Sequence, residues 1–200
     1  MYWVILGLLQ WFGNLVTMYW WNDLWLNEGF ASWMEFKGVS YTQPTWHMME
    51  QFWAKVVIPA LQLDSLASSH PVSTPVKDPK EIEAIFDTIS YKKGSSIIHM
   101  LEKYLGEDVL QAGLKDYLNK HKFGNAVTKD LWKALTKATN NKVDVEAIMN
   151  TWTLQMGYPL ITFSKGDLLD KDTQGWCVKQ SRFLASSQVY TVQYTVYDQY

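Results

Sequence analysis

The sequence predicts a mainly α-helical fold that is followed by a short β segment. Between residues 22 and 157, hydrophobic residues recur at the three- and four-residue spacing of amphipathic helices. From Leu160 onward the spacing changes to two, which is typical of strands. Hydrophobic residues make up 48% of the chain and aromatic residues 15%, as in a globular protein with a large core. We therefore expect a helical domain over residues 1–157 and the start of a β domain over residues 158–200.

The first 22 residues carry no charged side chain, which raises the question of a membrane span. Their length suits a span, and Trp and Tyr at both ends resemble an interfacial belt. Polar or small residues interrupt the apolar run at Gln10, Gly13, Asn14 and Thr17. No Lys or Arg flanks it, and Met1–Val4 lacks the basic start of a signal peptide. We expect a buried helix and a tight turn, with a spanning or anchoring segment as the alternative.

The next expected helix begins at Asn22–Asp23, a pair typical of an N-cap, and ends near Gly38. Its periodicity places Glu28 on one face, while Trp25 and Phe36 pack on another.

A further helical pattern runs from Pro44 to Ile58, and Pro59 is expected to bend or end it. The apolar stripe expected to pack inward consists of Trp46, Met49, Phe52, Trp53 and Val56. Leu61–Ser69 continues to His70–Pro71, and the proline-rich residues Ser73–Pro79 form a connector.

From Ser95 the sequence predicts four amphipathic helices, and their short loops favour antiparallel packing of neighbours. The first ends at Gly106, the second ends near residues 123–125, Thr128 caps the third and Asp144 opens the fourth. The residues expected to face the core are Ile98, Leu101, Leu105, Val109, Leu110, Leu114, Tyr117, Leu118, Leu131, Trp132, Leu135, Ile148, Met149 and Trp152. We interpret these stripes as core and not as a cofactor site.

Three strands are expected after the helices, at Leu160–Phe163, Trp176–Leu184 and Val189–Tyr197. Three strands are too few to close a sandwich, so they leave exposed edges. Such edges favour self-association through pairing with another chain.

Charge argues against a nucleic-acid partner, and cysteine content gives no sign of an oxidising compartment. With 18 Lys and Arg against 20 Asp and Glu, the net charge is −2, and no basic stripe indicates a nucleic-acid partner. The single cysteine, Cys177, cannot form an internal disulfide, so the sequence does not indicate an oxidising compartment.

Two neighbouring segments carry a resemblance to a known family. Gln10–Asn14 reads Gln-Trp-Phe-Gly-Asn, and Asn27–Ala31 reads Asn-Glu-Gly-Phe-Ala. Both resemble motifs of the gluzincin zinc aminopeptidases, which include membrane alanyl, glutamyl and thyrotropin-releasing-hormone-degrading aminopeptidases. In that family a His-Glu-x-x-His helix runs directly into Gln-Trp-Phe-Gly-Asn, and the Glu of the second motif is the third zinc ligand. The resemblance therefore implies that Glu28 is a metal ligand.

The same register shows that the first half of the signature is missing. It places the family's two histidines at Ile5 and Leu9 and its catalytic glutamate at Leu6. None of these side chains binds zinc or transfers a proton. Glu28 follows Leu9 by 19 residues, the separation that the family uses. Since catalytic zinc sites use three protein ligands and an open position, we expect that one carboxylate does not hold the ion stably.

A third segment, Ile85–Gly94, resembles the family's Phe-Asp-x-Ile-Ser-Tyr-x-Lys-Gly. There the tyrosine hydroxyl donates to the oxyanion of the tetrahedral intermediate, so the resemblance implies that Tyr91 has this catalytic role. The histidines offer no substitute for the missing zinc ligands, because His47, His70, His99 and His121 lack metal-ligand spacing. His70 precedes a proline in a loop.

The resemblance, over about Gln10–Leu184, implies the helical C-terminal half of a thermolysin-like peptidase domain over residues 1–157, followed by the first strands of a β-sandwich over 158–200. The intact enzymes remove N-terminal residues from peptides and hold the free amine with a Gly-x-Met-Glu-Asn motif, which this sequence lacks. The family also suggests a membrane-anchored ectoenzyme, although the chain shows no signal peptide.

Three hypotheses follow. The chain is a divergent or partial zinc aminopeptidase that is inactive as written. Alternatively, it is an incomplete reading of an active membrane aminopeptidase, with unrelated sequence before Gln10. A third hypothesis is a non-catalytic binding or dimerisation module that uses the exposed β edges.

Overall fold

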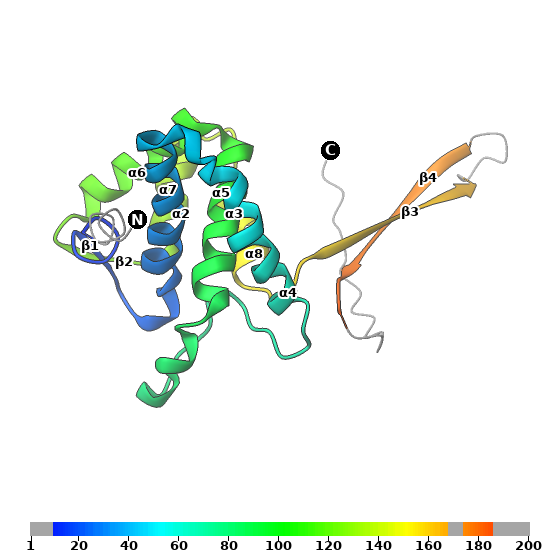
Figure 1. Ribbon diagram of the computed structural model, residues 1–200, viewed down its shortest axis with the longest axis horizontal. Coiled ribbons are helices and arrows are strands. Elements are labelled where there is room, and N and C mark those ends of the chain that lie inside the picture. The colour runs from blue at the N-terminus through cyan, green and yellow to red at the C-terminus, as the bar shows by residue number, and fades with distance from the viewer. Residues whose placement is uncertain (1–9, 168–173, 186–200) are drawn as a thin grey trace.

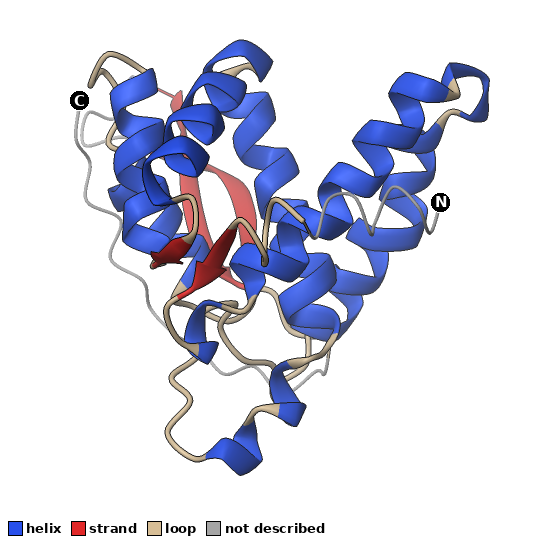
Figure 2. Cartoon of the chain, turned by 90° about the vertical axis from the view of Figure 1, so that its left-hand side faces the viewer, coloured by secondary structure: helices blue, strands red, loops and turns tan. Residues whose placement is uncertain are grey.

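The computed structural model describes residues 10–167 and 174–185. Helices dominate this part of the chain, together with two small β ribbons, which confirms the mainly α-helical class (Figure 1, Figure 2). Ile5, Leu6, Leu9 and the strand expected at Val189–Tyr197 lie outside the described residues. No helix within the described ranges combines the length and the hydropathy that a membrane crossing requires.

The described chain begins with the expected tight turn, in which Gly13 has a φ of 137° that favours glycine. Strand β1 (Val16–Met18) follows and pairs in parallel with β2 (Gly124–Ala126). Each strand has only three residues, so neither has the alternating pattern that marks a strand in a sequence.

Helix α2 (Trp25–Thr42) runs through the helical part and follows the short turn η1 (Trp21–Asp23). The N-cap expected at Asn22–Asp23 is wrong. Asp23 is buried and its carboxylate accepts hydrogen bonds from Thr128, at 2.7 Å from the hydroxyl and 3.3 Å from the amide nitrogen. A side chain committed to a distant partner cannot also cap its own helix. Gly38 does not end α2, which continues to Thr42.

The next helical segment has four parts: η2 (Pro44–Trp46), α3 (Met48–Phe52), the π-helical turn η3 (Trp53–Val57) and α4 (Ile58–Asp64). Pro59 does not end the helix. It lies in the first turn of α4, where its missing N–H costs little. The predicted stripe is partly wrong: Phe52 and Val56 are buried, whereas Trp46 and Trp53 are 53% and 56% exposed. Trp46 precedes a break in the helix at His47, which has a φ of 49°, and Trp53 lies off the face that buries Met48, Phe52 and Val56.

The connector that follows contains the short turns η4 (Pro79–Glu81) and η5 (Glu83–Ile85), and the π-helical turn η6 (Ile89–Lys93) comes next. The four expected helices are confirmed as α5 (Gly94–Leu105), α6 (Glu107–His121), α7 (Thr128–Ala138) and α8 (Val145–Thr153). Gly106 ends α5 with a φ of 88°, and the Asp144 carboxylate caps α8 by accepting from the Ala147 amide at 3.0 Å. Val127, and not Thr128, is the residue before α7.

Two of the expected strands form an antiparallel hairpin of β3 (Pro159–Asp167) and β4 (Gln174–Arg182). Figure 1 shows this hairpin extending away from the helices. Phe163 and Val178 are exposed on it. Helix α8 ends at Thr153 and β3 begins at Pro159, so the boundary expected at residues 157–158 falls between them, and the division into two domains stays a prediction.

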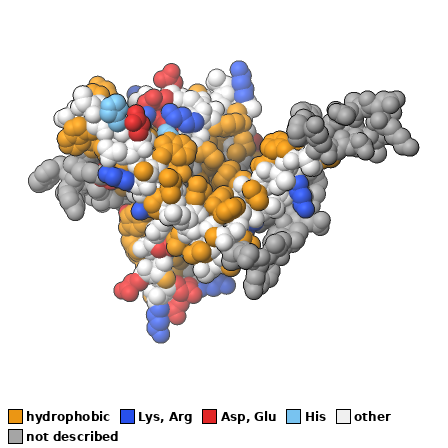
Figure 3. All heavy atoms as spheres, turned by 45° about the vertical axis from the view of Figure 1, so that its right-hand side comes forward, with side chains coloured by type: hydrophobic (Ala, Val, Ile, Leu, Met, Phe, Trp, Pro, Cys, Tyr) orange, Lys and Arg blue, Asp and Glu red, His pale blue; other side chains and the backbone are white. Residues whose placement is uncertain are grey.

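The core lies between α2, α3, α5, α6 and α7 and is built around large side chains that are fully buried, among them Trp25, Phe30, Phe52, Ile98, Leu131 and Trp132. Outside the core, an apolar surface is exposed to solvent. Figure 3 shows hydrophobic side chains gathered on one face of the molecule. The exposed apolar residues of η3 and α4 are Trp53, Ile58 and Leu61.

Candidate active site

The segments that carry Glu28 and Tyr91 lie against each other, although they are far apart in the sequence. A Cβ atom placed on Gly29 would lie 3.1 Å from the carbonyl carbon of Gly94, and one placed on Gly94 would lie 3.3 Å from the Cα of Gly29. The backbones of α2 and the start of α5 therefore touch. A side chain at either position would force the neighbouring backbone to shift. The contact places Glu28, the residue before Gly29, beside the turn η6, which Gly94 follows.

Tyr91 lies in η6, a π-helical turn, and such turns occur frequently at functional sites. Asp87 holds the start of this turn. One oxygen of its carboxylate accepts hydrogen bonds from the amides of Ile89 and Ser90, at 3.0 and 3.1 Å. Its carbonyl oxygen accepts from the Tyr91 amide at 3.2 Å. Three consecutive amides of the turn are thus tied to one residue.

The Glu28 carboxylate and the Tyr91 hydroxyl influence each other's pKa. Burial raises the pKa of Glu28, and the side-chain hydrogen bond with Tyr91 opposes that rise. Burial, together with the charge of Glu28 and this hydrogen bond, raises the pKa of Tyr91 to about 12. The phenol is protonated at neutral pH, and its hydroxyl interacts with the Glu28 carboxylate.

Replacing Glu28 with Gln is expected to lower the pKa of Tyr91 from about 12 toward the ordinary value near 10. A negative carboxylate disfavours the phenolate, so removing that charge makes ionisation easier, while burial keeps the pKa above its ordinary value. Titration of the Tyr91 ring carbon by NMR measures this pKa, with Tyr91→Phe for assignment. The matched control is Glu35→Gln on the same helix. An unchanged pKa in the Glu28→Gln variant would contradict the pairing.

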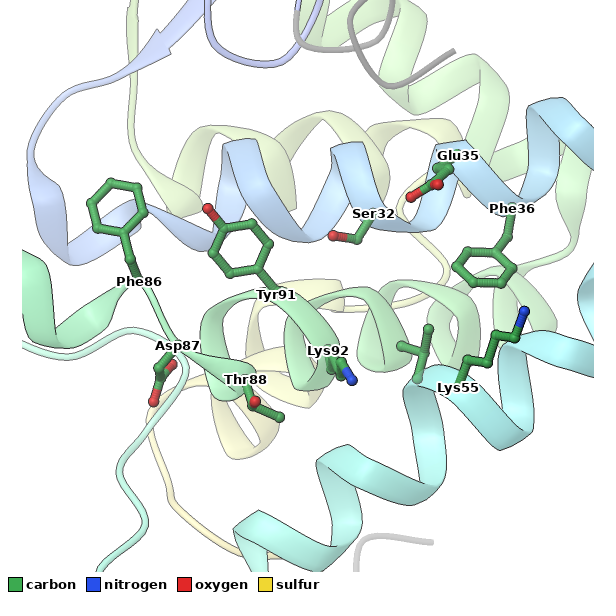
Figure 4. Close-up of a pocket in the computed structure, with 10 residues that line it drawn as sticks. Ser32, Glu35, Phe36, Lys55, Phe86, Asp87, Thr88, Tyr91 and Lys92 are labelled. Atoms are coloured by element: carbon green, nitrogen blue, oxygen red, sulfur yellow. The ribbon is translucent and has the colours of Figure 1, made fainter. Parts of the chain in front are cut away.

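Tyr91 lines a cavity of about 510 Å³ between α2, η3 and the Asp87–Lys92 segment (Figure 4). Figure 4 shows Ser32 and Glu35 on α2 and Lys55 on the opposite wall. Burial raises the pKa of Glu35. The lining residues are Ser32, Glu35, Phe36, Lys55, Val56, Phe86, Asp87, Thr88, Tyr91 and Lys92. The lining therefore combines acidic and basic side chains with the apolar side chains of Phe36, Val56 and Phe86.

The described residues do not complete a zinc site around Glu28. Within residues 10–167 and 174–185, no group of three His, Cys, Asp or Glu side chains is placed to hold a metal ion. The histidines have other neighbours: His47 pairs with Glu50, His70 with Asp87 and His99 with Glu102, while the ring of His121 packs on Tyr117. One carboxylate beside one phenol does not fit the three-ligand requirement of catalytic zinc.

Sequence reasoning missed a buried ion pair next to the site. The Lys93 ammonium lies 2.7 Å from the Asp64 carboxylate, and both side chains are almost fully buried. Lys93 also donates to the carbonyl oxygen of Gly157 at 3.1 Å, and Asp64 accepts from the Gly157 amide at 2.7 Å. The pair joins α4 and η6 to the segment that leads into β3. The lysine of the Tyr-x-Lys-Gly motif was the available signal, although its partner was not evident.

The comparison with known proteins adds the family. The Peptidase family M1 domain matches residues 8–152, which include Glu28 and Tyr91. The chain belongs to peptidase family M1. The family resemblance carried by the three segments is therefore confirmed, and the thermolysin-like description is consistent with the M1 domain.

Curated M1 relatives are similar over most of this chain. It is 48% identical over 181 residues to aminopeptidase 2, mitochondrial, of Saccharomyces cerevisiae, a match that covers 90% of this chain and 18% of the relative. It is 52% identical over 152 residues to glutamyl aminopeptidase of Bos taurus, covering 76% and 16%. It is 45% identical over 183 residues to aminopeptidase N of Homo sapiens, covering 88% and 18%. The chain thus spans less than a fifth of the length of these M1 relatives.

Proposed function

We propose that this chain carries the Glu28 and Tyr91 part of an M1 zinc aminopeptidase site and hydrolyses no peptide as its sequence stands. The observation that carries the proposal is the close approach of Glu28 and Tyr91, which brings together two segments that resemble the family's motifs. Glu28 is the proposed metal ligand, and Tyr91 is the proposed donor to a substrate oxyanion. The names of the M1 relatives, all aminopeptidases, support peptide N-termini as the substrate class of the complete site.

The reason for inactivity is the missing half of the site. In a zinc peptidase the bound ion polarises the substrate carbonyl and activates the attacking water. Ile5, Leu6 and Leu9 stand where the resemblance places two ligands and a general base. Hydrophobic side chains have no lone pair for zinc and no proton to exchange. Glu28 and Tyr91 alone retain a half-buried acceptor and a protonated donor.

Restoring the missing residues provides the test. The 200-residue chain is expected to bind no stoichiometric zinc and to release no amino acid from peptide substrates. The variant Ile5→His, Leu6→Glu, Leu9→His is expected to bind one zinc ion, because three protein ligands then surround the metal. Zinc content after dialysis and calorimetric titration measure the gain, independently of catalysis.

The control adds Glu28→Gln to the restored variant. If Glu28 is the third ligand, zinc affinity falls by about 100-fold or more, since even residues that only orient a ligand cost 10–100-fold. Equal zinc affinity with and without Glu28 would exclude it as a ligand. Aminopeptidase turnover by the unmodified chain that a chelator abolishes would overturn the proposed inactivity.

A second candidate is an active aminopeptidase in a longer protein whose sequence before Gln10 contains His-Glu-x-x-His. The observation that favours it is the start of the M1 match at residue 8, after Ile5 and Leu6. Intact mass with peptide mapping of the native protein tests it. A larger mass with that motif before Gln10 supports full activity, whereas an N-terminus at Met1 contradicts it.

A further inference from the structure

His70 lies between two hydrogen-bond acceptors. Its Nδ1 is 2.7 Å from the carbonyl oxygen of Pro71, and its Nε2 is 2.8 Å from a carboxylate oxygen of Asp87. A carbonyl oxygen accepts hydrogen bonds and never donates, and an ionised carboxylate does the same. Both ring nitrogens must then carry a proton, which makes the ring an imidazolium. The arrangement defines a charged pair.

Asp87 connects His70 to the segment that contains Tyr91. The oxygen that faces His70 is Oδ2, whereas Oδ1 accepts from the amides of Ile89 and Ser90. The two oxygens belong to one rigid planar group, so the bond from His70 sets the angle at which Oδ1 meets the two amides. The next residue in this turn is Tyr91.

We propose that His70 is a positioning residue for Tyr91: the protonated ring holds the Asp87 carboxylate in the orientation that fixes the first turn of η6. The proposal rests on the proposed function only for the role of Tyr91. It assigns His70 no contact with substrate or metal. The order of the η6 turn then depends on the protonation of a side chain outside the cavity lining.

The charges around His70 give the direction of the pH dependence. Asp87 faces one ring nitrogen and, through its hydrogen bond, raises the pKa of His70, while the positive charge of Lys93 lowers it. Lys93 is itself paired with Asp64. Burial opposes ionisation of Asp87, but hydrogen bonds from His70, Ser90 and Ile89 outweigh it and lower the pKa of Asp87.

The direction in which stability changes with pH follows from proton linkage. The stabilising contribution of a histidine with a raised pKa is complete below its unfolded pKa, near 6.5, and is lost as pH rises through the folded value. The His70 and Asp87 side chains are 28% and 27% exposed, so solvent can exchange protons with them. Hydrogen bonding of the Ile89 and Ser90 amides should therefore weaken as pH rises through the folded pKa of His70.

The experiment measures hydrogen-exchange protection of the Ile89, Ser90 and Tyr91 amides in the full chain between about pH 6 and pH 9, corrected for the intrinsic pH dependence of exchange. The expected result is a loss of about tenfold in protection, typical of losing a charge-assisted hydrogen bond, with the midpoint at the pH where the His70 ring titrates by NMR. His70→Gln is expected to show the low protection at every pH. The matched control is His47→Gln, which removes the exposed His47–Glu50 pair and should leave the profile unchanged.

Two outcomes would overturn the proposal. One is native protection that does not change while the His70 ring titrates. The other is the same pH profile in the His70→Gln variant as in the native chain. If His70→Gln does not fold, the native titration alone decides. Zinc binding by the restored variant is a separate readout, so a wrong assignment of Glu28 and a wrong role for His70 give different results.

Discussion

Replacing Lys93 with Met is expected to lower the free energy of unfolding by about 3–5 kcal/mol, the usual cost of removing one partner from a buried ion pair. Asp64 is fully buried and lies 2.7 Å from the Lys93 ammonium. Without the lysine, its charge loses its cation in a site that water does not reach. The bonds from Ser69 and Gly157 to Asp64 remain but carry no positive charge, and the Arg182 guanidinium contacts the main-chain carbonyl oxygen of Asp64 at 3.4 Å. Urea denaturation followed by tryptophan fluorescence measures the change.

Two further variants make this prediction specific. Lys92→Met changes the neighbouring lysine, which is not buried, and is expected to stay within about 0.5 kcal/mol of the native chain. The double variant Asp64→Leu, Lys93→Met is expected to recover much of the loss, because no uncompensated charge remains. If Lys93→Met is as stable as Lys92→Met, the pair does not hold α4, η6 and the β3 entry together.

Replacing Gly29 with Val is expected to cost about 3 kcal/mol, the upper part of the usual range for overpacking. The new Cβ would lie 3.1 Å from the Gly94 carbonyl carbon and 3.2 Å from its Cα. Both atoms are backbone, so no side-chain rotation relieves the contact and the helices must separate. The separation should also move Glu28 away from Tyr91 and lower the pKa of Tyr91 from about 12.

Denaturation and the NMR titration of the Tyr91 ring measure the two consequences of Gly29→Val together. The matched control is Ser40→Val, a β-branched substitution on the same helix at a half-buried position, with an expected cost of about 0.5 kcal/mol from helix propensity. Gly29→Val with native stability and a native Tyr91 titration would show that the close approach does not position the site.

Local patterns predicted the elements that depend on neighbouring residues. The four helices α5–α8 follow the expected apolar spacing, because each buries one face against the others. Gly106 and Asp144 end and open helices as expected, since a positive φ and an N-cap are properties of single residues. The β3–β4 hairpin follows its alternating residues.

The errors arise from distant partners or from local breaks in the helix, and neither is visible in the apolar spacing. The Asn22–Asp23 cap failed because Asp23 bonds Thr128, 105 residues away. The stripe through Trp46 and Trp53 failed because Trp46 lies in the separate turn η2 and Trp53 lies off the helix face that buries Met48, Phe52 and Val56. The ribbon of β1 and β2 was missed because its pairing joins segments on either side of the five helices α2–α6.

The sequence by itself determined the helical class, the M1 motifs with Glu28 and Tyr91, and the hydrophobic residues where two zinc ligands and a base are expected. These are properties of residue types at short spacings. Only the tertiary structure decided that Gly29 meets Gly94, that Lys93 pairs with Asp64 and that His70 holds Asp87. Each of these contacts joins separate segments. Their geometry depends on how helices pack, and local periodicity specifies which face is buried but not which partner covers it.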